Sequence, residues 1–222
     1  MDKRADIIKM LNEQGLMPLF FHADPNVCTD LLKVLYDAGV RIVEFTNRGE
    51  KALENFALMK ACAVKDYPDL YLGAGTIKNA DDANKFIDAG ADFLVSPALA
   101  EDVLTVAQQH NRLWIPGCMT PTEILRAENM GLHFVKIFPG NVLGTAFISA
   151  IRELFPKMSF MPTGGVETSE QNLRTWFDAG VMAVGMGSKL IDVKSLVDKD
   201  YSKISVNTKS VLETIKIIKK KF

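Results

Sequence analysis

The chain has 222 residues, of which 48% are hydrophobic and 24% charged, and its formal net charge is −1. This is the composition of a soluble globular protein, and a chain of this length can bury roughly 70% of the surface that it exposes when unfolded. A charge this close to zero gives no reason to expect a nucleic acid or an anionic membrane as a partner. No apolar run approaches the ~18 residues of a membrane span, and the three cysteines have no metal-ligand spacing. We therefore expect a cytoplasmic protein without a bound metal.

The first predicted element is a helix over residues 5–14, which Gly15 ends. From there, helices that end in a glycine alternate with short apolar runs that we interpret as strands. A last amphipathic pattern over about 201–220 predicts a C-terminal helix. The predicted strands lie near residues 17–21, 41–46, 70–74, 92–95, 112–115, 133–138, 159–162 and 181–185.

Eight strand–helix alternations predict an α/β fold, a closed (β/α)8 TIM barrel with one helix before the first strand and an extra C-terminal helix. A doubly wound open sheet is the alternative, because six strands could accommodate much of the pattern. We find no linker rich in proline or serine, so we expect residues 1–222 to form a single domain.

Residues 133–140, His-Phe-Val-Lys-Ile-Phe-Pro-Gly, place a lysine in the middle of an apolar strand. Alternation puts Lys136 on the same face as Phe134 and Phe138. Burial among apolar groups lowers the pKa of an amine, which makes a neutral nucleophile accessible near neutral pH. For a lysine considered alone, the more common case is a packed stem with its amine in water.

Glu44 and Arg48 stand at the end of the second predicted strand. Alternation puts Glu44 on one face with Ile42 and Thr46, pointing into the barrel, where a carboxylate needs a partner or a raised pKa. Glu44 is a candidate general acid or base, and a structural ion pair is an equally good interpretation. Arg48 could bind a carboxylate through two hydrogen bonds, or it could be a surface arginine of the loop.

Glycine, proline and hydroxyl residues follow several other predicted strands. Gly-Ala-Gly-Thr (73–76) allows close backbone approach and offers the Thr76 hydroxyl, and Ser-Pro (96–97) can form a pocket wall. Pro-Thr-Gly-Gly (162–165) and Gly-Met-Gly-Ser (185–188) follow the seventh and eighth strands, where barrels of this type often bind phosphate. Each loop alone could be a plain turn, but the two together favour a phosphate site.

With these motifs assembled, the chain resembles the aldolase family that acts on 2-keto-3-deoxy-6-phosphogluconate (KDPG) and 4-hydroxy-2-oxoglutarate (KHG). The resemblance runs from Gly39 to about Leu190. The lysine block together with the Glu-Phe-Thr-Asn-Arg block is specific, whereas the glycine blocks are shared by several phosphate-binding barrels. The matching blocks are residues 39–48, 73–76, 96–97, 115–117, 135–139 and 162–165.

The resemblance implies a class I aldolase, in which Lys136 forms a Schiff base with a small-molecule 2-keto acid and Glu44 moves protons. The products would be pyruvate and an aldehyde such as glyceraldehyde 3-phosphate, no cofactor is implied, and family members are commonly homotrimers. The remaining roles implied are carboxylate binding by Arg48 and Thr76, packing by Pro97 and Phe138, and phosphate binding by Gly164, Gly165, Gly187 and Ser188.

Two other interpretations of the same residues stay open. In a phosphate-binding barrel isomerase or epimerase, Lys136 and Glu44 would move protons without covalent capture. In a non-catalytic binding module, the pocket would bind keto acids or phosphates without turnover. Departures from the usual family pattern at Ser-Pro-Ala (96–98), Pro-Gly-Asn-Val-Leu-Gly (139–144) and Gly-Met-Gly-Ser-Lys (185–189) leave open which sugar acid is cleaved.

Overall fold

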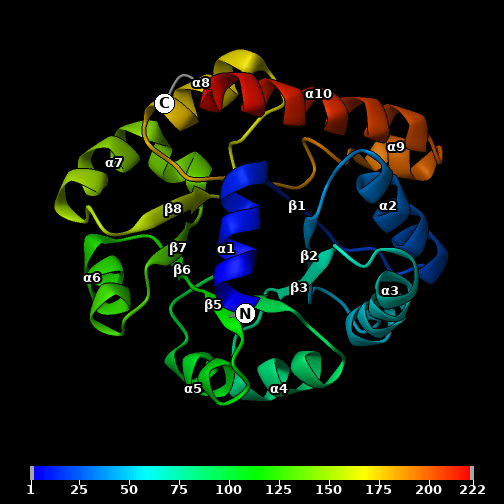
Figure 1. Ribbon diagram of the computed structural model, residues 1–222, viewed down its shortest axis with the longest axis horizontal. Helices are drawn as coiled ribbons and strands as arrows, with labels where there is room; N and C mark the ends of the chain where they lie inside the picture. The colour runs from blue at the N-terminus through cyan, green and yellow to red at the C-terminus, as the bar shows by residue number, and fades with distance from the viewer. Residues whose placement is uncertain (1–2, 221–222) are drawn as a thin grey trace.

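The computed structural model describes residues 3–220, and its parallel strands are surrounded by helices (Figure 1). Residues 1, 2, 221 and 222, the ends of the predicted single domain, lie outside the described part. The strands are β1 (Leu16–Phe20), β2 (Ile42–Thr46), β3 (Tyr71–Gly75), β4 (Phe93–Val95), β5 (Leu113–Ile115), β6 (Gly117–Cys118), β7 (Phe134–Ile137), β8 (Ser159–Pro162) and β9 (Val184–Met186). The helices are α1 (Lys3–Gln14), α2 (Pro25–Asp37), α3 (Ala52–Asp66), α4 (Ala80–Asp88), α5 (Glu101–Gln109), α6 (Pro121–Asn129), α7 (Gly140–Leu154), α8 (Glu170–Asp178), α9 (Val193–Val197) and α10 (Tyr201–Lys219).

The strands form two sheets, one of six strands in the order β5-β4-β3-β2-β1-β9 and one of three in the order β6-β7-β8. Every neighbouring pair is parallel, as expected for strands joined by helices. This confirms the predicted α/β class, and the sheet curls into a partial barrel of the TIM-like kind. The predicted helices before β1 and after β9 are present as α1 and α10.

The curled sheet separates two hydrophobic cores. Side chains on the inner face, among them Ile42 and Phe134, pack together with Ile7 and Leu11 of α1. Side chains on the outer face pack against the surrounding helices, and Val43 is one of them. The alternation of faces predicted for β2 and β7 is therefore confirmed. Helix α1 lies across the middle of the ring of helices in Figure 1 and covers one end of the inner core.

Four details differ from the sequence prediction. The apolar run at 112–115 is followed beyond Pro116 by a further strand, β6. Proline has no N–H to donate to a neighbouring strand, but the Pro116 carbonyl accepts a hydrogen bond from the Lys136 amide at 2.8 Å. The last strand begins at Val184, whereas we predicted residues 181–185. The short helix α9 was not predicted, and α7 is interrupted at Gly144, whose φ of 71° is not helical.

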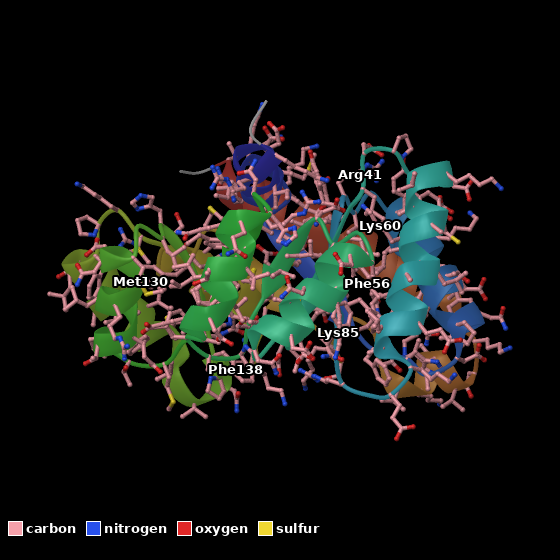
Figure 2. All side chains as sticks on the ribbon, turned by 90° about the horizontal axis from the view of Figure 1, so that it is seen from below. Arg41, Phe56, Lys60, Lys85, Met130 and Phe138 are labelled. Atoms are coloured by element: carbon pink, nitrogen blue, oxygen red, sulfur yellow. The ribbon has the colours of Figure 1, made fainter. Side chains whose placement is uncertain are left out.

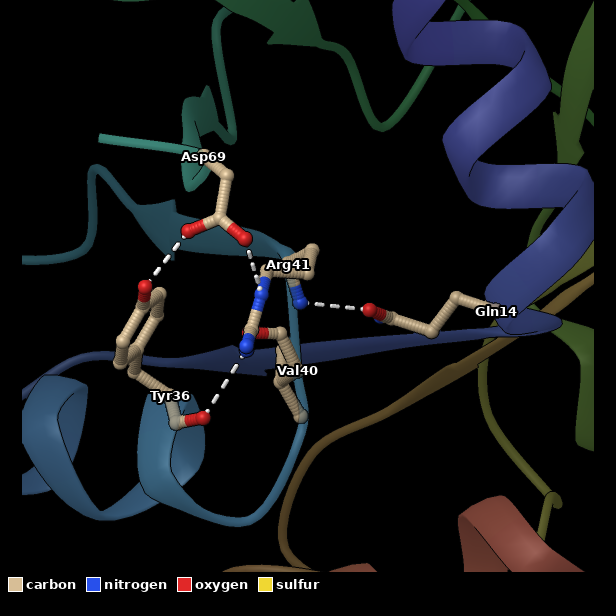
Figure 3. Close-up of polar contacts among 5 residues, drawn as sticks. All are labelled: Gln14, Tyr36, Val40, Arg41 and Asp69. Atoms are coloured by element: carbon tan, nitrogen blue, oxygen red, sulfur yellow. Dashed lines mark hydrogen bonds and ion pairs between the residues drawn. The ribbon is translucent and has the colours of Figure 1, made fainter. Parts of the chain in front are cut away.

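A polar network fixes the start of β2 (Figure 3). The Arg41 side chain donates to Asp69 at 2.6 Å and to the Tyr36 carbonyl at 3.0 Å, and its guanidinium lies over the Tyr36 ring. The Arg41 amide donates to the Gln14 side chain at 2.6 Å, which ties α1 to the same strand. Because β2 also carries Glu44, this network holds the strand that presents the carboxylate.

A second anchor holds the beginning of α1. Asp92, only 2% exposed, accepts from the amines of Lys3 and Lys60 at 2.7 and 2.6 Å and from the Leu72 amide at 2.7 Å. A carboxylate buried this deeply needs such compensation. The anchor keeps α1 against the end of the inner core. Among residues 3–220, none of the helices combines the length and the apolar character needed to cross a membrane.

Candidate active site

Lys136 and Glu44 meet inside the curled sheet, although β7 and β2 belong to different sheets. The Lys136 Nζ lies 3.5 Å from the Glu44 Oε1. Lys136 is 4% exposed and Glu44 is fully buried. The two residues that the sequence singled out separately therefore form one buried ion pair.

The Glu44 carboxylate is short of partners. Neither of its oxygens accepts a hydrogen bond within the described part of the chain. Gly75 of β3 lies directly against it, and a Cβ at this position would overlap the carboxylate. A buried polar group without a partner costs free energy, so such groups concentrate where a ligand completes them.

Phe138 lies beside the amine. The Lys136 Nζ is 5.4 Å from the centre of the Phe138 ring, within the range of a cation–π contact. Figure 2 shows Phe138 toward the end of the molecule opposite α1 and Arg41. The pair and its aromatic neighbour therefore lie toward the C-terminal ends of the strands, where barrels of this type place their chemistry.

Thr76 and Pro97 are each connected to the ion pair through one glycine, Gly75 and Gly117 respectively. Thr76 follows Gly75 and has a φ of 61°, which is strained for a β-branched residue. The Pro97 carbonyl lies against Gly117, and Gly117 is the register partner of Lys136. The structure thus places Thr76 near the carboxylate and Pro97 near the lysine strand.

Arg48 lines a pocket of about 290 Å³ together with Thr46, Gly187 and Ser188. The other walls of this pocket are apolar side chains of β1, of α9 and of the segments next to them. The structure therefore groups Arg48 with two of the predicted phosphate-binding residues. A larger cavity, of about 490 Å³, lies against Lys219 and Met182 and includes none of the predicted site residues.

Gly164 and Gly165 form a tight turn after β8, with φ angles of 93° and 75°. Asn141 packs so closely on both that a side chain at either position would collide with it. A bridge between Thr163 and Gly185 joins this turn to β9 and its following loop. The four predicted phosphate-binding residues therefore lie in two neighbouring loops.

Thr163 is a candidate that the sequence analysis missed. Its hydroxyl is buried, has no hydrogen-bond partner within residues 3–220, and lies against Gly185. Its amide donates to the Ile137 carbonyl at 3.0 Å, next to the lysine strand. The alternation of side chains along β8 could have identified it, because Met161 faces the inner core and Thr163, two residues later, is expected on the same face.

Cys118 is buried near the lysine strand, and burial raises the pKa of its thiol to about 12. It is protonated at neutral pH and offers no thiolate. Within the described residues, no group of three or more His, Cys, Asp or Glu side chains is arranged to hold a metal ion.

Comparisons with known proteins agree on one family. The family model of the KDPG and KHG aldolases matches residues 7–207. The 2-dehydro-3-deoxy-phosphogluconate aldolase of Treponema pallidum is 32% identical over 190 residues, 85% of this chain and 87% of that protein. The KHG/KDPG aldolase of Escherichia coli is 33% identical over 189 residues, 84% of this chain and 85% of that protein.

A solved structure agrees with these relatives. The KDPG aldolase of Legionella pneumophila, with pyruvate captured as a covalent carbinolamine, superimposes with a TM-score of 0.83. It is 25% identical, and the match covers 92% of this chain and 97% of that one. The chain belongs to the KDPG and KHG aldolase family.

Proposed function

We propose that the protein is a class I aldolase that cleaves a 2-keto-3-deoxy-6-phospho sugar acid or 4-hydroxy-2-oxoglutarate to pyruvate and an aldehyde. The observation that carries this proposal is the buried Lys136 amine, 3.5 Å from a Glu44 carboxylate that lacks hydrogen bonds within residues 3–220. A buried amine can serve as a nucleophile, and a carboxylate beside it can exchange protons with it directly or through water.

The reaction begins when Lys136 passes its ammonium proton to Glu44, directly or through water, and the neutral amine attacks the C2 carbonyl to form a carbinolamine. Glu44 transfers the protons that allow water to leave, which yields a protonated imine. Glu44 then accepts the proton of the C4 hydroxyl, the C3–C4 bond breaks, and its electron pair moves into the imine to form an enamine. The aldehyde leaves, C3 is protonated, and water releases pyruvate from Lys136.

The surrounding residues position the substrate. Arg48 and Thr76 bind the carboxylate of the pyruvyl half, as the family resemblance implies, and the position of Thr76 directly after Gly75, which lies against Glu44, supports this role. Pro97 and Phe138 pack the walls, and the ring of Phe138 lies over the amine. The phosphate of the substrate binds to two loops, through Gly164, Gly165, Gly187 and Ser188.

We also infer that the two sheets close into a barrel of eight strands, with β5 and β6 counted as one strand interrupted at Pro116. Two hydrogen-bonded junctions support this closure. One is the bridge between Thr163 and Gly185, and the other is the bond from the Lys136 amide to the Pro116 carbonyl. The whole of residues 1–222 would then form one domain around a single active site.

The assembly and compartment are proposals as well. The family resemblance supports a homotrimer. The three free cysteines suit the reducing cytoplasm. Sedimentation velocity at several protein concentrations tests the trimer, and a monomer at every concentration would contradict it.

Trapping with pyruvate and borohydride tests the chemistry. The wild-type protein is expected to gain irreversible mass on Lys136, whereas Lys136→Met should gain none. Lys85→Met, which removes an exposed lysine of α4, is the matched control and should be labelled like the wild type. An unlabelled wild type, or a labelled Lys136→Met, would refute the proposal.

The isomerase or epimerase interpretation is not favoured, because the family model and the curated relatives reported above are aldolases. It would gain support only from isomerisation of a sugar phosphate without a borohydride adduct.

A further inference from the structure

Lys189 directly follows Ser188 in the loop after β9, and its side chain extends toward the loop after β8. Its Nζ lies 3.5 Å from the Glu167 Oε1, two residues beyond Gly165. Both side chains are more than half exposed, at 63% and 53%. This ion pair therefore spans the two loops that form the proposed phosphate site.

The same loops offer free amide groups. The backbone N–H groups of Gly164, Gly165, Ser188 and Lys189 have no hydrogen-bond acceptor within residues 3–220. The turn after β9 is closed instead by the amides of the next two residues, which both donate to the Gly187 carbonyl. Neighbouring free N–H groups in turns of this kind bind anions.

We propose that Lys189 recognises the terminal phosphate of the substrate, and that Glu167 holds its amine between the two loops until the phosphate arrives. This inference rests on the proposed function. An exposed ion pair is weak because water screens it. An ammonium–phosphate contact is charge-assisted, and the phosphate monoester carries up to two negative charges. The amine therefore moves from Glu167 to the phosphate.

The consequence is a substrate class. Lys189 adds a positive charge at the end of the substrate distant from the keto group, beside amide donors that suit any oxyanion. A keto acid that ends in a phosphate is therefore preferred to one that ends in a hydroxyl or a carboxylate.

The test compares kcat/KM for 2-keto-3-deoxy-6-phosphogluconate with kcat/KM for unphosphorylated 4-hydroxy-2-oxoglutarate. Lys189→Met is expected to lower the ratio of the two values about tenfold or more, mainly through the KM of the phosphorylated substrate. Glu167→Gln should raise the ratio, because it removes the competing acceptor. Lys194→Met, which removes an exposed lysine of the adjacent helix α9, is the matched control and should leave the ratio as it is.

Inhibition by inorganic phosphate provides an independent readout, and it should weaken in Lys189→Met and persist in Lys194→Met. An unchanged ratio in Lys189→Met, or the same fall in both lysine variants, would overturn the inference. A fall in Glu167→Gln would overturn the holding role of Glu167. Borohydride trapping of pyruvate separates this result from the aldolase proposal. If the wild type is labelled and the ratio does not respond, only the role of Lys189 fails.

Discussion

Gly75 lies against the carboxylate of Glu44, with no room for a side chain between them. Gly75→Ala is therefore expected to push the carboxylate away from its position 3.5 Å from the Lys136 amine. A displacement of about 1 Å in a catalytic group can cost about 10²-fold in rate, and we expect kcat/KM to fall by that order. Steady-state kinetics, with the stability measured in urea, checks this expectation.

Gly131→Ala is the matched control for this variant. Gly131 has a φ of 78°, and a Cβ there would meet nothing within 4 Å. The substitution should cost about 1–2 kcal/mol of stability through backbone strain and leave kcat unaffected. If both variants lose kcat to the same degree, the loss at Gly75 reflects weakened folding and not the position of Glu44.

The buried ion pair predicts a non-additive effect on stability. Lys136→Met leaves the Glu44 carboxylate buried without a counter-charge, and loss of one partner of a buried pair costs about 3–5 kcal/mol. The double variant Lys136→Met/Glu44→Leu removes both charges and should recover most of this loss, while remaining inactive. Urea unfolding at pH 7 measures these two variants and the single variant Glu44→Leu, and simple addition of the two single losses would contradict the prediction.

Thr163→Val separates function from stability. The variant removes a buried hydroxyl that has no partner within residues 3–220 and keeps nearly the same shape. We expect an equal or higher free energy of unfolding, together with a kcat/KM about tenfold lower if the substrate is the missing partner. A variant that is fully active, or one that unfolds much more easily, would show that the hydroxyl does not serve the substrate.

Asp69 should make stability depend on acid pH. The hydrogen bond from the Tyr36 hydroxyl, together with Arg41, lowers the pKa of Asp69 below its ordinary value of 3.8. Because the folded-state pKa is the lower one, the stabilisation is fully present above pH ~4 and is lost as the pH falls toward the folded-state value. Asp69→Asn should therefore lower Tm at pH 7 and approach the wild type as the pH falls through the folded-state pKa of Asp69. A difference in Tm that is constant over this range would contradict the assignment.

Much of the fold was predictable because the local signals agree with the tertiary structure. Glycines such as Gly15, with a φ of 68°, end helices where the sequence predicted, and alternation identified the inward face of β2. The burial of Lys136 was predictable for the same reason, since its neighbours on the strand are apolar and the strand is buried on both faces.

The remaining details depend on contacts between distant segments. The continuation of the strand beyond Pro116 depends on a hydrogen bond from Lys136, twenty residues later, and no local pattern predicts it. The pocket that joins Arg48 to Ser188 depends on how α9 packs against β1, and α9 itself is too short to give a periodic signal. The position of the Thr163 hydroxyl against Gly185 likewise depends on the packing of β8 beside β9.

Helix α1, held by Asp92, covers one end of the inner core, and Phe138 lies toward the opposite end of the molecule (Figure 2). In the proposed reaction, pyruvate is still attached to Lys136 when the aldehyde forms. The covalent bond therefore sets the order of departure, with the aldehyde first and pyruvate second. Product-inhibition kinetics should show pyruvate competing with the substrate and the aldehyde inhibiting non-competitively, whereas two competitive products would mean that release is random.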